Sequence, residues 1–197
     1  MARIIYGLAF VGGFVIMSLE LLGGRVLAPY FGSSIYVWGS IITVFMLSLA
    51  LGYLWGGWLS LRSPTMARFG SIFLVGAVLL YPLVFLSEPA LVWIFSNIED
   101  PRYGSLVASA LLFIAPTVIL GMISPYSVRL LVATTEGAGQ VAGRLYFAST
   151  LGSALGTLAT SFYFVLWFEI NTILTLLTSA LLAMGIIGWL AHRSALR

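Results

Sequence analysis

Residues 36–61 form an uninterrupted apolar stretch that limits the possible folds of this chain more than any other feature. The stretch carries no charged side chain and exceeds the roughly 20 residues that a helix needs to cross the ~30 Å hydrocarbon core of a bilayer. The composition agrees, because 61% of the 197 residues are hydrophobic and only 8% are charged, against about 25% charged residues in soluble domains. The sequence therefore predicts an all-α, polytopic membrane helix bundle.

Apolar runs between charged residues predict six transmembrane helices in a single transmembrane domain, residues 1–197. Pro82 predicts a kink in the third helix, and Pro116 and Pro125 predict a bent or locally opened fourth helix. Trp93 and Phe95 belong to an expected outer amphipathic segment at about residues 88–103. The six predicted spans are about 4–24, 36–60, 67–87, 104–128, 145–167 and 171–191.

The arginines are distributed unequally between the two sides of the predicted bundle. Only Arg25 and Arg102 fall in the loops of one side, and positively charged residues concentrate on the cytoplasmic side of membrane proteins. We therefore expect a bacterial inner-membrane protein with both termini in the cytoplasm. The arginines on the expected cytoplasmic side are Arg3, Arg62, Arg68, Arg129, Arg144, Arg193 and Arg197.

Two predicted spans carry small residues at every fourth position, which is typical of helices that approach one another closely. Ser48, Gly52 and Gly56 mark the second span, and Gly152 and Gly156 mark the fifth. We interpret both stripes as helix-packing surfaces.

A short string also occurs twice, as ALGYL at residues 50–54 and ALGTL at residues 154–158. The segments Ala28-Pro29-Tyr30 and Ser124-Pro125-Tyr126 form a second pair. Two three-helix units, at about residues 4–87 and 104–191, would cross the membrane in opposite senses. The sequence thus predicts two inverted repeats, the arrangement inside each half of a major-facilitator transporter.

The first span ends with an acid, a base and an aromatic residue near irregular backbone. Glu20 precedes Gly23-Gly24, which we expect to break the helix, and Arg25 and Tyr30 follow. Ionisable groups at membrane depth are costly and usually face a cavity or a partner. We expect a cavity here for a lipid headgroup or a small amine, closed on the opposite side by the bend at Pro125; the alternative is that both charges reach water at the membrane boundary.

Other side chains are weaker candidates for contacts with a ligand or a partner. The rings of Tyr36, Trp38 and Tyr126 are suited to a headgroup or a cationic amine, although membrane-interface anchoring explains the first two equally well. Arg129 and Arg144 flank a polar, glycine-rich connector and are suited to an acidic partner or a lipid phosphate.

The sequence offers no reaction by itself. No catalytic group of nucleophile, base and orienting residue is recognisable, and one His with no Cys argues against a metal site. No cofactor motif is present, and the basic footprint of a nucleic-acid-binding protein is missing. The absence of cysteine leaves the redox compartment undetermined.

Five segments resemble the membrane domain of the transmembrane spermidine/spermine-synthase-like proteins. The first half contributes ELLGGRVLAPYFG at 20–32, YVWGSII at 36–42 and LGYLWGG at 51–57. The second half contributes GMISPYSVRL at 121–130 and GRLYFASTLGSALG at 143–156. The resemblance covers nearly the whole chain.

This resemblance implies an amine-related role together with a separate soluble catalytic domain. Members of that family commonly continue into a cytosolic aminopropyltransferase-like domain, and nothing in these residues resembles that domain. Aminopropyl transfer is therefore assigned to no residue here, and such an activity would need a separate subunit.

Three functions agree with these features. The first is a membrane subunit that anchors a soluble partner and holds a lipid or amine. The second is a half-unit of a small-molecule transporter, which would have to associate with a second copy, although the mid-membrane charges of ion-coupled transport are lacking. The third is an accessory subunit of a larger membrane complex. Membrane lipids and a second subunit or copy are the expected partners, while the substrate, the partner's identity and the oligomeric state are left open.

Overall fold

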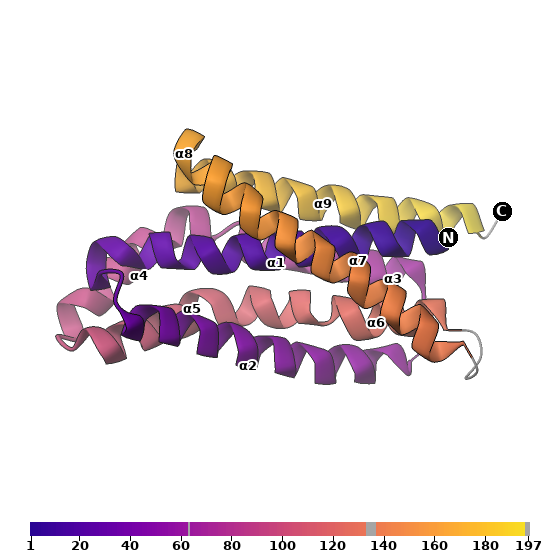
Figure 1. The fold of residues 1–197 in the computed structure, drawn as a ribbon, viewed down its shortest axis with the longest axis horizontal. Helices are drawn as coiled ribbons and strands as arrows, with labels where there is room; N and C mark the ends of the chain where they lie inside the picture. The colour runs from indigo at the N-terminus through magenta and orange to yellow at the C-terminus, as the bar shows by residue number, and fades with distance from the viewer. Residues whose placement is uncertain (63, 133–136, 196–197) are drawn as a thin grey trace.

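The computed structural model describes residues 1–62, 64–132 and 137–195, which form an elongated helical bundle (Figure 1). The first four helices are α1 (Ala2–Phe31), α2 (Ile35–Ser60), α3 (Met66–Leu80) and α4 (Leu83–Asn97). The remaining elements are α5 (Pro101–Gly121), α6 (Ile123–Leu131), α7 (Ala138–Ala159), the π-helix η1 (Thr160–Phe164), α8 (Val165–Trp167) and α9 (Ile170–Ala195).

The long helices are compatible with a multi-pass membrane protein. Five spans are long and apolar enough to cross a bilayer, with α5 and α6 forming one of them and α7 to α8 another. The pair α3 and α4 gives a sixth if it is taken as one broken span. The N- and C-termini lie at the same end of the bundle (Figure 1), which we call the terminal end; the end with residues 32–34, 98–100 and 168–169 is the loop end.

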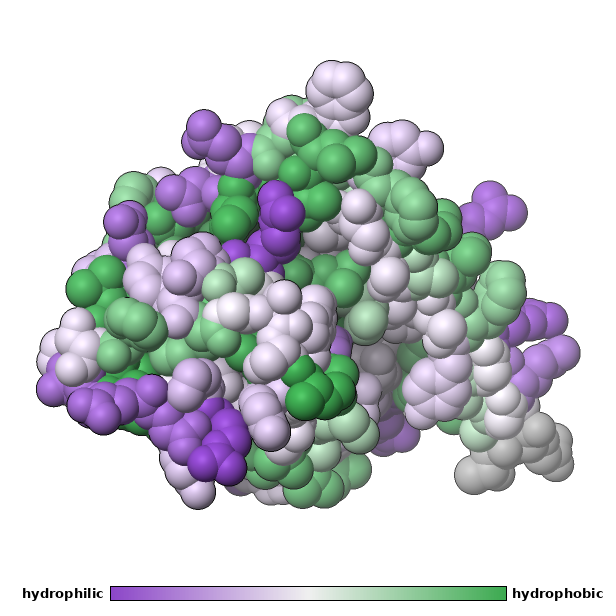
Figure 2. Space-filling view, turned by 60° about the vertical axis from the view of Figure 1, so that its left-hand side comes forward, coloured by the Kyte–Doolittle hydropathy of each residue, from purple (hydrophilic) through white to green (hydrophobic). Residues whose placement is uncertain are grey.

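Hydrophilic residues are sparse on the surface near the loop end. Figure 2 turns this end forward and shows them in small, separate groups among apolar and weakly polar side chains. Asp100 at this end precedes α5 and accepts hydrogen bonds from the backbone N–H and the guanidinium of Arg102. These bonds hold the pKa of the Asp100 carboxyl below its usual value. Both residues are thus satisfied locally.

The first helix does not break at Gly23-Gly24, so this expectation is wrong. α1 runs without interruption through Pro29 to Phe31, and the turn into α2 uses Gly32 with a positive φ of 75°. A Cβ on Gly24 would lie 2.7 Å from the Trp38 ring. The glycine pair therefore makes room for side chains of neighbouring helices, which serves packing rather than a change of chain direction.

The predicted kink at Pro82 is confirmed. α3 and α4 meet at Tyr81-Pro82 with a bend of 46°. The helix that contains Trp93 begins at Leu83 rather than near Pro89, which lies inside α4. The expected outer segment is thus helical over residues 88–97 as part of α4, and residues 101–103 already belong to α5.

The fourth predicted span opens at only one of its two prolines. Pro116 lies inside the continuous helix α5, whereas the helix is interrupted at Met122 between α5 and α6. Pro125 cannot donate to the carbonyl of Gly121, four residues earlier, and its ring crowds that carbonyl. This explains the position of the break.

The fifth predicted span is longer than expected at its N-terminal end and ends where expected, at Trp167. α7 begins at Ala138, so residues 138–144 are helical although we expected them to belong to a polar connector; residues 133–136 of that connector lie outside the described residues. At the other end, the π-helix η1 leads into α8, and the chain turns at Phe168 into α9. Glu169 and Asn171 interrupt an apolar run of the sequence, which predicts a turn between the last two helices, and this turn is present.

Three helix pairs make the most extensive contacts: α1 with α7, α2 with α5, and α3 with α9. Each pair has glycine at its closest approach. A Cβ on Gly52 would collide with the carbonyl oxygen of Val118, and one on Gly156 with that of Phe14. A Cβ on Gly70 would lie 2.6 Å from the carbonyl oxygen of Gly185.

These contacts give the small-residue stripes a specific test. We expect Gly52→Leu to separate α2 from α5, because the obstacle is backbone that cannot rotate away. Overpacking costs about 1–3 kcal/mol, so the melting temperature of the detergent-solubilised protein should fall by roughly 5–10 °C. The matched control is Gly57→Leu on the same helix, where an added Cβ meets nothing within 4 Å. Equal melting temperatures for the two variants would contradict this account of the packing.

Candidate functional site

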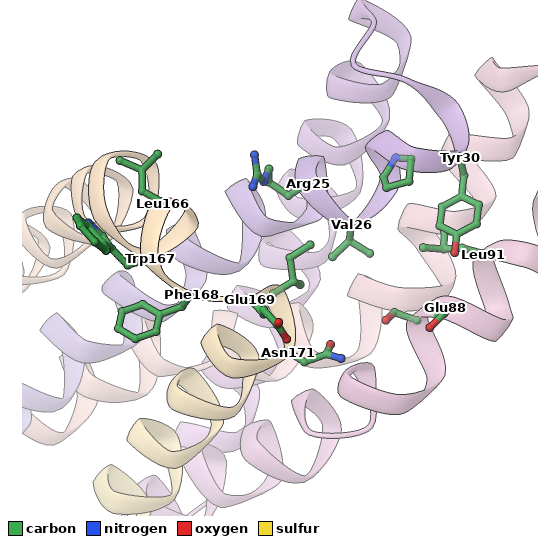
Figure 3. A pocket seen from close by; sticks show the side chains of 13 residues that line it. Arg25, Val26, Tyr30, Glu88, Leu91, Leu166, Trp167, Phe168, Glu169 and Asn171 are labelled. Carbon is green, nitrogen blue, oxygen red and sulfur yellow. The ribbon is translucent and has the colours of Figure 1, made fainter.

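A cavity with a volume of about 640 Å³ lies at the loop end. It is an open cavity between the last turns of α1, the first half of α4 and the connection from α8 to α9 (Figure 3). The side chains that line it are Arg25, Val26, Pro29, Tyr30, Ser87, Glu88, Leu91, Leu166, Trp167, Phe168, Glu169, Ile170 and Asn171.

Arg25 contributes the positive charge of this cavity. Its Nη2 donates a hydrogen bond of 3.5 Å to the carbonyl oxygen of Val165, close to the end of the helix that runs from α7 through η1 to α8. The last carbonyls of a helix carry partial negative charge and favour a cation. Arg25 is thus oriented by the protein and keeps further N–H donors for another molecule.

Two carboxylates lie in the same cavity without an ionic partner. Glu88 extends from α4 and Glu169 from the α8–α9 connection, with Asn171 in the first turn of α9 (Figure 3). Within the described residues, neither carboxylate forms a salt bridge or a side-chain hydrogen bond, in contrast to the paired Asp100. Their oxygen atoms can therefore accept hydrogen bonds from a bound molecule.

Aromatic side chains form the remaining walls. Trp167 and Phe168 come from the α8–α9 side, and Tyr30 comes from the last turn of α1. The ring of Tyr30 packs edge-on against Phe95 of α4, with 6.3 Å between centroids. Such rings bind cations through their faces, so they complement the carboxylates.

The chemistry of the cavity favours a cation. One guanidinium and two carboxylates give a formal charge of −1, and the guanidinium already has a carbonyl partner. No group of three or more His, Cys, Asp or Glu capable of holding a metal ion occurs among the described residues.

The structure places only some of the predicted residues together. Arg25 and Tyr30 line the cavity, whereas Glu20 does not. Because α1 is continuous, residues five positions apart point about 140° away from each other. Glu20 is half-buried and makes no salt bridge with any described residue.

The other predicted aromatic residues lie elsewhere. Tyr36 lies near the guanidinium of Arg102, 6.0 Å from it, and Trp38 packs against Gly24. Tyr126 is fully buried, stacks on Phe69 and accepts a hydrogen bond of 3.1 Å from the Thr65 N–H.

Tyr126 and Pro125 therefore do not close the loop-end cavity as we expected. Arg129 and Arg144 are exposed, and neither forms a salt bridge with a described residue. Arg129 lies in the last turn of α6 and Arg144 in the first turns of α7. Both residues are available to a partner.

Sequence reasoning missed Glu88, Glu169, Trp167 and Asn171 as lining residues. Glu169 and Asn171 interrupt an otherwise apolar run of the sequence, which indicates only a turn between the last two helices. The predicted topology puts Glu88 and Glu169 on the same side as Arg25, which was the available signal. They lie close together because of the bend at Pro82 and the π-helix before α8. The direction that the chain takes after either feature cannot be predicted from the sequence.

Comparison of this chain with protein-family models, with curated proteins and with solved structures finds no match.

Proposed function

We propose that this chain is a multi-pass membrane subunit that binds a small organic amine in the loop-end cavity. The carrying observation is that two carboxylates, Glu88 and Glu169, line one cavity together with the aromatic residues Tyr30 and Trp167, and that neither carboxylate forms a salt bridge with a described residue. A molecule with more than one ammonium group is suited to two carboxylates on separate elements. The resemblance to spermidine/spermine-synthase-like membrane domains supports the same class of ligand.

The proposal predicts that the purified protein in lipid nanodiscs binds spermidine, measured by isothermal titration calorimetry. Glu88→Gln and Glu169→Gln keep the shape of each side chain and remove its charge. Exposed ion pairs contribute about 0.2–1 kcal/mol, so each substitution should weaken binding by about two- to fivefold. Binding should also weaken as the salt concentration rises.

Glu99→Gln is the matched control, because Glu99 lies at the same end and does not line the cavity. Spermidine affinities that are equal in all three variants and the parent would refute the proposal. If instead a phospholipid co-purifies and Arg25→Gln removes it while Glu88→Gln does not, the cavity is a lipid headgroup site and the amine proposal is wrong.

We further propose that the bundle is built from two inverted repeats, α1 to α4 and α5 to α9. In these repeats α1 corresponds to α5, α2 to α7 and α3 to α9. The contact of α1 with α7 then corresponds to that of α5 with α2, and the contact of α3 with α9 corresponds to itself. These are the three most extensive helix pairs. The same correspondence holds for single residues. Gly52 contacts Val118 and Gly156 contacts Phe14, and each residue of the first contact lies 104 positions from its counterpart in the second.

This equivalence supports one register for the whole repeat. Phe14 and Val118 are 104 positions apart, as are Gly52 and Gly156. The string match between Ala28-Pro29-Tyr30 and Ser124-Pro125-Tyr126 has an offset of 96 instead. We therefore propose the offset of 104 for the first and fourth spans as well as for the second and fifth.

The orientation of the bundle is a separate proposal. We propose that the terminal end faces the cytoplasm of a bacterium, supported by the excess of arginines at this end. A reporter that fluoresces only in the cytoplasm, fused to the C-terminus, should be active, and a periplasmic phosphatase fused there should be inactive. The reverse result would place the loop-end cavity on the cytoplasmic side.

We also propose that the terminal end receives a soluble partner with an acidic surface, supported by Arg129 and Arg144, which are exposed and form no salt bridge with a described residue. Purification from native membranes at low salt should retain such a protein, and the double variant Arg129→Gln with Arg144→Gln should lose most of it. Arg102→Gln at the loop end is the control. Loss of the same protein from the control would argue against docking at the terminal end.

A further inference from the structure

A second hollow, distinct from the amine cavity, lies nearer the terminal end between α2 and α7. Both helices pack on α6 but hardly on each other, and this leaves a cleft of about 380 Å³ whose floor is formed by α6. Six of the seven lining residues carry a hydroxyl group. The lining residues are Tyr53, Ser124, Pro125, Tyr146, Ser149, Thr150 and Ser153.

Most of these hydroxyls have no hydrogen-bond partner in the part of the chain that the structure describes. Elsewhere in the bundle, Ser127, Thr157 and Thr178 donate to the carbonyl four residues earlier, which is the usual solution in apolar helices. The hydroxyls without a hydrogen-bond partner there are single and fully buried, on Ser48, Ser109, Thr117 and Thr160, whereas those of the cleft are gathered at one opening. Ser153 donates to the Gly13 carbonyl at 3.2 Å. In contrast, the side chains of Tyr53, Ser124, Tyr146, Ser149 and Thr150 make no hydrogen bond to any described residue.

The cleft lies within the membrane-spanning length of its helices, given the membrane location proposed above. Ser149 and Ser153 follow Arg144 by five and nine residues, so they lie roughly 8–14 Å further along the helix. Hydrocarbon cannot satisfy unpaired hydroxyls at this depth. Water or a polar solute must therefore reach them.

The helix α7 itself is unsuited to face lipid on all its free sides. The span formed by α7, η1 and α8 is the least apolar and the least buried of the five long spans. If this span were surrounded by lipid, we would expect it to be the most apolar of the five spans. The hydroxyl-bearing face of α7 thus needs polar contacts from outside the described chain.

We propose that this cleft binds a small, uncharged, polyhydroxylated solute at membrane depth. No charged side chain lines the cleft, so an ion would enter without a counter-charge. Hydroxyl groups both donate and accept hydrogen bonds, which matches a polyol, and the rings of Tyr53 and Tyr146 offer apolar faces for its carbon skeleton. The volume falls within the range of about 300–1,000 Å³ that is usual for ligand sites.

The cleft shares no lining residue with the amine cavity. Its failure to bind a polyol would leave amine binding untouched, and the reverse also holds. The floor residue Ser124 lies immediately after the break at Met122. The same irregularity that interrupts the fourth span therefore brings a hydroxyl into the cleft.

The chain contains no cysteine, so single-cysteine variants report on one position each. We expect Thr150→Cys in proteoliposomes to react with a charged, water-soluble methanethiosulfonate at least ten times faster than Leu158→Cys. Leu158 lies on the same helix, is 51% exposed and does not line the cleft. Sorbitol or glycerol at millimolar concentrations should slow the labelling of Thr150→Cys at least threefold, and spermidine should not.

Adding Tyr53→Phe and Tyr146→Phe to Thr150→Cys should abolish protection by sorbitol while the labelling rate without sorbitol stays the same. Ser124→Ala should likewise abolish protection by sorbitol without changing the basal labelling rate, and this variant replaces the tyrosine variants if those are unstable. Rapid labelling that neither sorbitol nor glycerol slows would show that the cleft holds only water and would overturn the proposal. So would an unreactive Thr150→Cys, whether it faces lipid or forms a disulfide with a second copy.

Discussion

Close contact between helix backbones is the interaction on which the rest of the bundle depends. Lipid tails are as apolar as a leucine side chain, so burial of apolar side chains contributes little free energy to the association of helices in a membrane. Glycine at the closest approach of three helix pairs lets whole backbones touch and gain dispersion energy along their length. The stripe that contains Gly52 sets the position of α2 on α5, and Gly156 does the same for α7 on α1. Both hollows lie where helices do not meet in this way.

Irregular backbone determines where these hollows open. The bend at Pro82 turns α4 so that Glu88 reaches the loop-end cavity, and η1 places the carbonyl of Val165 within reach of Arg25. At the other end, the interruption at Met122 brings Ser124 to the floor of the hydroxyl-lined cleft. Without these irregularities, the same residues would lie at the membrane boundary or face lipid and would line no hollow.

The two hollows differ in chemistry because they lie at different depths. Charged side chains are tolerated near the ends of the helices, where water is available, and the loop-end cavity accordingly combines Arg25 with Glu88 and Glu169. Deeper along the helices a charged group without a counter-charge would have a high desolvation cost, whereas neutral polar groups such as the hydroxyls of Tyr53 and Ser149 are tolerated. The ligands that we propose differ accordingly: a charged amine for the loop-end cavity and a neutral polyol for the hydroxyl-lined cleft.

The sequence by itself determined the helical class, the long apolar spans, the kink at Pro82 and the positions of the glycine stripes, because each depends on local composition or on a period along one helix. It did not determine that α1 continues through Gly23-Gly24, since a glycine pair that ends a helix and one that admits the Trp38 ring look alike until the neighbour is known. Only the tertiary structure separated Glu20 from Arg25 and brought Glu88 and Glu169 to Arg25. The direction of a side chain depends on an unbroken helical phase, and the meeting of distant residues depends on the angles at bends such as Pro82, which neighbouring helices set.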